Sequence, residues 1–208
     1  MSLFPDQPFS GADTFADAYF DQVHKAQASV SRQALREADA VLREAIENGA
    51  NIFSCGNGGS AAISNHLLCD CLKGVQGGTS LRPRVHTLSS SVELITAIAN
   101  DIGVEEIFAL PLASLGRQGD VLVVISSSGA SPNIIRAIEV AKGLGMRVIA
   151  MTGFEGGQAA HLADVSLHVD AANYGVIEDV HQSLMHILAQ NLRQAHLTDP
   201  TQIGQVRF

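Results

Sequence analysis

Charged residues and long hydrophobic runs are both scarce in this chain. Asp, Glu, Lys and Arg make up 16% of its 208 residues and no polar low-complexity tract is present, which excludes wholesale disorder. No uninterrupted apolar run approaches the ~18 residues of a transmembrane helix. The N-terminus lacks a basic start followed by an apolar stretch, so no secretory signal is visible. We therefore expect a folded protein without a membrane-spanning segment.

Basic residues and cysteines are scarce as well. The chain has 13 Lys and Arg against 21 Asp and Glu, a net charge of −8 at pH 7, and its basic residues form no cluster. Such a chain is poorly suited to bind nucleic acid or an anionic membrane. The three cysteines, Cys55, Cys69 and Cys71, are an odd and locally bunched set, unlike a disulfide framework. These features predict a cytoplasmic protein with no nucleic-acid or membrane partner.

The hydrophobic residues, 46% of the chain, are enough for one sizeable core. We divide the chain into an N-terminal lead-in and helix (1–30), one α/β domain (31–197) and a short C-terminal tail (198–208). Apolar spacing predicts helices over Asp13–Gln27, Ser31–Asn48, Ser60–Lys73, Pro132–Leu144 and Ile177–His196. Short apolar runs predict strands at Asn51–Cys55, Val85–Ser89, Val121–Ile125, Arg147–Met151 and Val165–Val169.

This alternation of strands and helices favours a parallel sheet with helices on both faces. The third and fourth strands are apolar without clear alternation, as is typical of strands buried on both sides. We predict a flavodoxin-like five-stranded sheet in which the first strand lies between the second and the third, followed by the fourth and the fifth. A helical extension precedes it.

Two loops rich in serine and glycine follow neighbouring strands of this predicted sheet. Gly56–Ser60 follows the first strand, Ser126–Ser131 follows the third, and a helix begins directly after each loop. Pro132 after Ser131 predicts a capped helix start. Helix N-termini bind anions through backbone N–H groups and hydroxyls, and ligands of such sheets bind where these strand ends meet. The loops therefore predict a phosphate site; the alternative is a pair of ordinary strand-to-helix turns.

Nucleotide cofactors are the main competitors for these loops. Residues 56–61 also match the G-x-G-x-x-A dinucleotide pattern, but residues 75–92 contain no Asp or Glu to bind a ribose, which argues against NAD. NADP stays an alternative, because Arg82 or Arg84 could bind its additional phosphate. The Gly-Lys-Ser/Thr of a nucleoside-triphosphate loop is absent. The expectation is a small phosphorylated ligand and no nucleotide cofactor.

Five sequence blocks carry a further signal. In chain order they are CGNGGSAAISNH, LITAIANDIG, GDVLVVISSSGASPNIIRAI, GMRVIAMTGFEGG and IEDVHQSLMHIL. This set, between Ala34 and Gln194, resembles the sugar isomerase (SIS) domain, and within it the sedoheptulose 7-phosphate isomerase (phosphoheptose isomerase) branch. The resemblance implies aldose–ketose isomerisation of a sugar phosphate through an enediol, zinc as a cofactor and a homotetramer. Two alternatives remain: a non-catalytic sugar-phosphate-binding protein, and an isomerase of a different ketose phosphate.

The resemblance also implies roles for individual residues. Catalysis falls to Asp70 and His186. The substrate and its phosphate are assigned to Asn57, Gly58, Ser60, Ser126, Ser127, Ser128, Ser131 and Glu178. A zinc-type metal set comprises His66, Asp70, Glu178 and His186.

The chain departs from the family at four positions. Asp70 is one methylene shorter than the family's Glu, which retracts its carboxylate by about 1.5 Å. Glu178 replaces a neutral amide, and Ser91 and Gly175 stand where the heptose enzymes carry Asp. Because those aspartates contact sugar hydroxyls in the family, the departures bear on substrate identity more than on fold.

Spacing along the predicted helices limits the metal set. His66 and Asp70, four residues apart, project from one face and can chelate one ion. Glu178 and His186 are eight residues apart, about 12 Å along a straight helix. Either only one of them reaches the ion, or they come from different chains, or the helix begins after Glu178; we expect a site at a subunit boundary. His181, about 140° round the helix from His186, is expected behind the site or on the surface.

Overall fold

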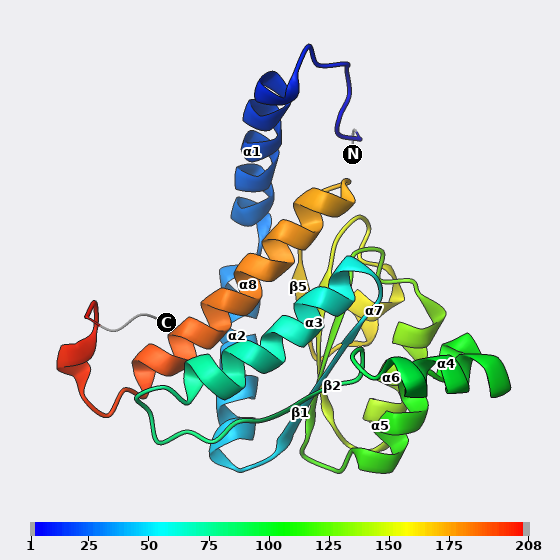
Figure 1. Cartoon of the computed structure of the whole chain (residues 1–208), viewed down its shortest axis with the longest axis vertical. Coiled ribbons are helices and arrows are strands. Elements are labelled where there is room, and N and C mark those ends of the chain that lie inside the picture. Colours follow the sequence, from blue (N-terminus) through cyan, green and yellow to red (C-terminus); the bar gives the residue numbers. More distant parts are fainter. Residues whose placement is uncertain (1–2, 206–208) are drawn as a thin grey trace.

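Helices and strands alternate along the computed structural model, which describes residues 3–205 (Figure 1). The strands are β1 (Asn51–Gly56), β2 (Arg84–Thr87), β3 (Val121–Ser126), β4 (Arg147–Thr152) and β5 (Val165–His168). The α-helices are α1 (Ala12–Ser29), α2 (Arg32–Glu47), α3 (Gly59–Cys69), α4 (Val92–Asp101), α5 (Ala109–Leu115), α6 (Pro132–Gly143), α7 (Gly157–Leu162) and α8 (Tyr174–Ala195). Shorter turns are η1 (Asp70–Val75), η2 (Val104–Glu106) and η3 (Pro200–Gln202). Residues 1–2 of the predicted lead-in and 206–208 of the predicted tail lie outside the described residues.

The five strands form one parallel sheet in the order β2-β1-β3-β4-β5. This is the predicted order, and the flavodoxin-like α/β fold is confirmed. β1 and β3 pair in register up to their carboxyl ends, where Gly56 lies opposite Ile125. The serine-rich loops that follow these two strands are therefore neighbours at the same edge of the sheet.

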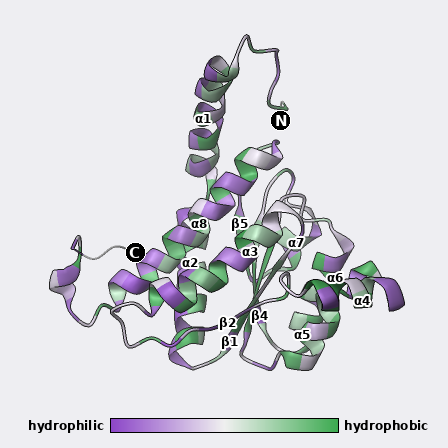
Figure 2. Ribbon diagram, in the orientation of Figure 1, coloured by the Kyte–Doolittle hydropathy of each residue, from purple (hydrophilic) through white to green (hydrophobic). Residues whose placement is uncertain are grey.

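The central strands are buried on both faces, and each face is covered by a different set of helices. In β3, Val121, Val123 and Ile125 pack with apolar residues of α2, α3 and α8. Leu122 and Val124 point the other way and pack with α5 and α6. The central strands β3 and β4 are accordingly hydrophobic along most of their length, whereas the surrounding helices have hydrophobic and polar sides (Figure 2). This double burial explains the lack of alternation in the sequence of β3.

The N-terminal helices play different parts. α2 is fixed at both ends by its own sequence, since the Ser31 hydroxyl accepts a hydrogen bond from the Ala34 N–H (3.2 Å) and Gly49 adopts a φ of +68° after the last turn. α1 extends beyond the sheet and packs along the beginning of α8 (Figure 1). There the Tyr19 hydroxyl donates to the Asp179 carboxylate (2.8 Å). α1 is thus attached to the domain chiefly through α8.

Two helix boundaries differ from the prediction by more than two residues. The helix expected over residues 60–73 is α-helical only to Cys69 and continues as the π-helix η1. π-Helical turns are rare and occur frequently at functional sites. The last helix begins three residues before its expected start, because the Asn173 side chain accepts a hydrogen bond from the Val176 N–H (3.0 Å) and caps the first turn.

The loop after β3 packs backbone to backbone on the loop after β4. Gly129 adopts a φ of +61°, and a Cβ at this position would collide with the carbonyl oxygen of Gly156. The Gly129 carbonyl also accepts a hydrogen bond from the Ala159 N–H (2.9 Å). Only glycine meets both requirements at this position.

We expect Gly129→Ala to destabilise the protein by about 2 kcal/mol or more, through backbone strain and the collision. At this chain length that lowers the melting temperature by about 4–8 °C. Gly143→Ala is the matched control, because nothing lies within 4 Å of a Cβ added there at the end of α6. Thermal denaturation followed by circular dichroism measures both; equal melting temperatures for the two variants would contradict the packing described.

Candidate functional site

The two serine loops line a single cavity of about 120 Å³ at the carboxyl edge of the sheet. The residues around it are Asn57, Ser60, Ile125, Ser126, Ser127, Ser128, Ser131, Tyr174 and Glu178. The structure thus brings together every residue assigned to the substrate and its phosphate except Gly58, which is the residue before α3. Tyr174 was not anticipated; its position just after a capping Asn gave no sign of a role.

Hydrogen bonds hold the two loops against each other. The side-chain amides of Asn57 and Asn133 donate a hydrogen bond to each other, each 2.9 Å long, and so join the first loop to the start of α6. Within the second loop the Ser126 hydroxyl accepts from the Gly129 N–H (3.2 Å), and the Ser128 hydroxyl accepts from the Ala130 N–H (3.3 Å). Because the Asn57 side chain is committed to this pair, its backbone is what faces a ligand.

Several donors in this cavity are left without protein partners. The Ser127 hydroxyl is buried and has no hydrogen-bond partner within residues 3–205. The hydroxyls of Ser60 and Ser131 make no hydrogen bond in the same described part of the chain, and Ser131 stands at the N-cap of α6 without capping it, contrary to prediction. A buried unpaired hydroxyl is costly unless a ligand satisfies it. Together with the N-termini of α3 and α6, these hydroxyls make a site for an oxyanion.

An acidic side chain shares this cavity. The Glu178 carboxylate lies so close to Gly59, the first residue of α3, that a Cβ there would collide with it. Burial, with a smaller contribution from the Asp179 carboxylate, raises the pKa of Glu178. A carboxylate at a helix N-terminus occupies the position that suits an anionic ligand. Glu178 therefore opposes phosphate binding whenever it is ionised.

A second polar cluster lies at the far end of α3. Asp70 contacts two imidazoles: its Oδ2 lies 2.7 Å from His186 Nδ1 and its Oδ1 lies 3.3 Å from His66 Nε2. The two rings meet edge to face with centroids 5.0 Å apart. Although shorter than the family's Glu, Asp70 reaches both rings from the junction of α3 with the π-helix η1. One potential ligand atom from each of these three residues lies within 4.8 Å of the others.

One member of the predicted metal set lies apart from this cluster within the single chain. Glu178 is not part of the group, and α8 already contains both Glu178 and His186, so a helix that begins after Glu178 is excluded. Instead the Gln182 side chain occupies the intervening turn, with Nε2 2.9 Å from His186 Nε2 and 3.3 Å from His66 Nδ1. Sequence reasoning missed Gln182, although its four-residue spacing from both Glu178 and His186 places it on their face of the helix.

Neighbouring residues of the sequence lie elsewhere. His181 is fully buried, with Nε2 3.1 Å from the Thr152 carbonyl oxygen, so the surface position considered for it is wrong. Burial lowers the pKa of His181 to about 4. Cys69 is exposed and Cys71 is buried, and neither belongs to the cluster of potential ligands found among residues 3–205. Arg84 begins β2 and therefore lies at the opposite edge from the glycine-rich loop, away from where an NADP phosphate would bind.

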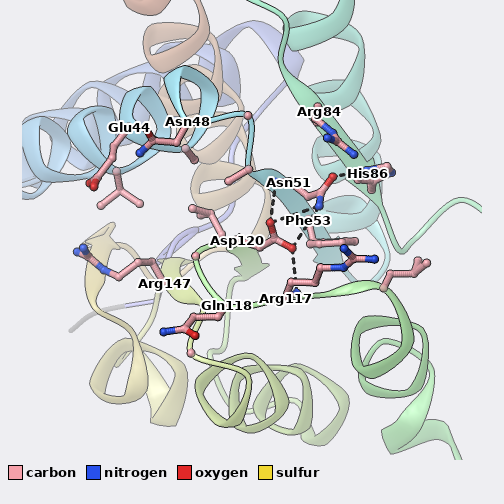
Figure 3. Close-up of a pocket in the computed structure, with 18 residues that line it drawn as sticks. Glu44, Asn48, Asn51, Phe53, Arg84, His86, Arg117, Gln118, Asp120 and Arg147 are labelled. Carbon is pink, nitrogen blue, oxygen red and sulfur yellow. Dashed lines mark hydrogen bonds between the residues drawn. The ribbon is translucent and has the colours of Figure 1, made fainter.

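A larger cavity, about 850 Å³, opens at the amino edge of the sheet (Figure 3). Arg84, Arg117 and Arg147 line it, but so does the buried Asp120, which accepts hydrogen bonds from the Asn51 and Arg117 N–H groups (2.8 and 2.9 Å). α2, α5 and α6 end at this edge and present the negative ends of their dipoles to it. The helix ends at this edge thus disfavour an anion, and the smaller cavity is the candidate oxyanion site.

Comparison with known proteins agrees with this geometry. The SIS domain matches residues 18–153. A phosphoheptose isomerase from Helicobacter pylori (strain P12) is 37% identical over 160 residues, 76% of this chain and 81% of the relative. The structure of a phosphoheptose isomerase from Francisella tularensis superposes with a TM-score of 0.80 at 32% identity, covering 88% of this chain and 99% of that one. The structure of phosphoheptose isomerase GmhA from Neisseria gonorrhoeae superposes with a TM-score of 0.80 at 31% identity, covering 88% of this chain and 98% of that one.

In the part of the chain that the structure describes, no helix combines the length and the hydropathy needed to cross a membrane.

We expect Glu178→Gln to tighten sulfate binding about tenfold at pH 7.5, or ~1.4 kcal/mol, because it removes a negative charge from the oxyanion cavity. The raised pKa of Glu178 means that the wild-type carboxyl gains its proton as the pH falls through a range above the usual one for glutamate. The two proteins should therefore converge in affinity at pH 4.5. Isothermal titration with sulfate, which stays dianionic, measures both values.

Glu44→Gln is the control for that charge change, since Glu44 lines the larger cavity at the opposite edge. It should leave sulfate affinity unchanged at both pH values. Equal tightening by Glu44→Gln and Glu178→Gln would show a general effect of net charge and contradict binding beside Glu178.

Proposed function

Because the chain belongs to the SIS-domain family, in its phosphoheptose isomerase branch, we propose that it interconverts sedoheptulose 7-phosphate and the corresponding aldose phosphate. The observation that carries this proposal is the placement of an oxyanion cavity and an imidazole–carboxylate cluster along one pair of helices. The first binds a phosphate and the second performs proton transfer.

The separation of the two sites suits a long sugar. Ser60 and His66 are six residues apart on α3, about 9 Å along the helix. An extended seven-carbon chain spans about 8 Å at C–C bond lengths near 1.5 Å, whereas a five-carbon chain spans about 5 Å. A heptose phosphate bound by the serine loops is therefore long enough to bring its carbonyl end to the cluster.

Asp70 and His186 supply the acid and base of the reaction. In the ketose-to-aldose direction, Asp70 accepts the C1 proton while His186 protonates the carbonyl oxygen at C2, which gives an enediol. Return of the proton to C2 and loss of the proton on the C1 oxygen give the aldose. General acid–base catalysis of this kind requires both groups within hydrogen-bond reach of the substrate, and their 2.7 Å contact keeps them together.

The donor set also fits a divalent cation. Imidazoles are ligands that zinc prefers, and His66 and His186 would hold it, with the Asp70 carboxylate in contact with both rings. When bound, the ion would polarise the sugar carbonyl.

One departure from the family favours an altered sugar specificity as the second candidate. Gly175 stands where the heptose enzymes carry Asp, and a Cβ there would lie 2.9 Å from the Tyr19 hydroxyl. Tyr19 thus takes the space of a sugar-binding carboxylate. Burial, together with its hydrogen bond to Asp179, raises the pKa of Tyr19 to about 12, so the hydroxyl stays protonated as a donor. An isomerase of another ketose phosphate remains the alternative on this ground.

We also propose a homotetramer in the cytoplasm. α1 projects from the domain, Phe20 on it is 67% exposed, and four aromatic rings cluster at its outer end. Exposed apolar surface of this kind supports burial against other subunits. Three free cysteines, two of them buried, support a reducing compartment.

We expect Asp70→Asn and His186→Ala each to lower isomerase turnover by about 10²–10⁴-fold, because each removes one partner of the proton transfers. Sulfate affinity should stay within about twofold, since the serine cavity is intact. NMR of ketose phosphates with five, six and seven carbons measures turnover, with the exposed His161→Ala as control. Absence of conversion by the wild type, with and without zinc, would contradict the isomerase.

We expect light scattering to give a mass of about 88 kDa, four times 21.9 kDa. Phe20→Asp should shift the distribution to smaller species, because it places a charge on the exposed apolar side of α1. Asp17→Asn on the same helix, also exposed, should not. A fully active monomer would contradict both the tetramer and a site shared between subunits.

A further inference from the structure

The four ring nitrogens of His66 and His186 face two different groups. Asp70 faces one nitrogen of each ring, His66 Nε2 and His186 Nδ1. Because an ionised carboxylate only accepts hydrogen bonds, these two nitrogens carry the ring protons. The other two, His66 Nδ1 and His186 Nε2, then carry the lone pairs, and both face the side-chain amide of Gln182.

Gln182 therefore stands where the two imidazole lone pairs converge. Its amide nitrogen lies 2.9 Å from one of these nitrogens and 3.3 Å from the other, and its two N–H groups match the two acceptors. A cation that accepts both lone pairs meets Gln182 at that point. Asp70, on the other side of the rings, orients them through their N–H groups, as carboxylates commonly do behind metal-binding histidines.

We propose that Gln182 supplies the amide ligand of the divalent cation in this chain, in place of residue 178. An amide side chain can turn about its last bond and exchange its nitrogen for its oxygen without a change of shape. With the amide turned, Oε1 is a neutral oxygen ligand directed at the point where the lone pairs converge. This inference rests on the cation site proposed above and adds to it a residue of this chain.

The position of Glu178 supports the exchange. Its carboxylate lies against Gly59 at the beginning of α3, whereas the imidazoles lie at the other end of that helix. Glu178 is one helical turn before Gln182, and Gln182 is one turn before His186, so all three share a face of α8. Only the last two reach the cluster, and Glu178 belongs to the oxyanion cavity.

Zinc binding to the full chain tests this without substrate. Protein stripped with a chelator is titrated with Zn²⁺ against a chromophoric competitor, and folding is checked by circular dichroism before zinc is added. We expect Gln182→Ala to weaken zinc binding by about 10–100-fold. Glu178→Gln should stay within about twofold of the wild type, and His186→Ala should lose the site.

Gln182→Glu separates a ligand from a mere hydrogen-bond donor. It keeps an oxygen ligand but loses both N–H groups, so zinc affinity at or above that of the wild type supports ligation. Weakening equal to that of Gln182→Ala would overturn it, as would loss of zinc binding in Glu178→Gln with Gln182→Ala unaffected.

Activity is read separately from binding. A wild type that binds zinc through Gln182 but converts no sugar phosphate overturns the isomerase and leaves the ligand assignment standing. An active wild type whose zinc affinity is unchanged in Gln182→Ala overturns the ligand assignment alone. A wild type that binds no zinc overturns the cation site and Gln182 with it.

Discussion

The packing of α3 alongside α8, in the same direction, is the constraint on which the site depends. Glu178 lies against Gly59 at one end of the pair, and His186 contacts Asp70 at the other. α3 begins where β1 ends, so its first turn belongs to the oxyanion cavity and its last turn to the imidazoles. Because both helices are rigid, the distance between phosphate and carbonyl subsites is set by residue count along α3.

The candidate oxyanion cavity of this acidic protein offers oriented neutral donors rather than cations. The cavity contains hydroxyls and two helix N-termini but no lysine or arginine, within the residues that line it. The larger cavity shows the converse: its arginines surround a buried aspartate and the negative ends of three helices (Figure 3). The local charge of the side chains is therefore a poor guide to where an anion binds in this fold. The helix N-termini, whose dipoles favour an anion, lie at the carboxyl edge of the parallel sheet only.

The polar side chains along α8 differ from the family's pattern, because Glu178 replaces the family's amide and Gln182 provides an amide one turn later. A carboxylate at position 178 lines the serine-rich cavity, and the amide of Gln182 stands one turn later beside the imidazoles. Asp70 compensates for its shorter side chain by its place at the junction of α3 and the π-helix, where it reaches both rings.

The order of elements, the two serine loops and the pairing of His66 with Asp70 were predictable, because each depends on local periodicity or on spacing within one helix, whereas His186 was assigned to the site only through the resemblance to the SIS family. Ser126 ends β3, Ser131 directly precedes α6, and His66 and Asp70 are separated by a single turn. What separated Glu178 from the cluster and brought Gln182 into it is the register between α3 and α8, which joins residues more than 100 positions apart. No local pattern encodes that register. It is set by side-chain packing of both helices on the sheet, and only the tertiary structure decides it.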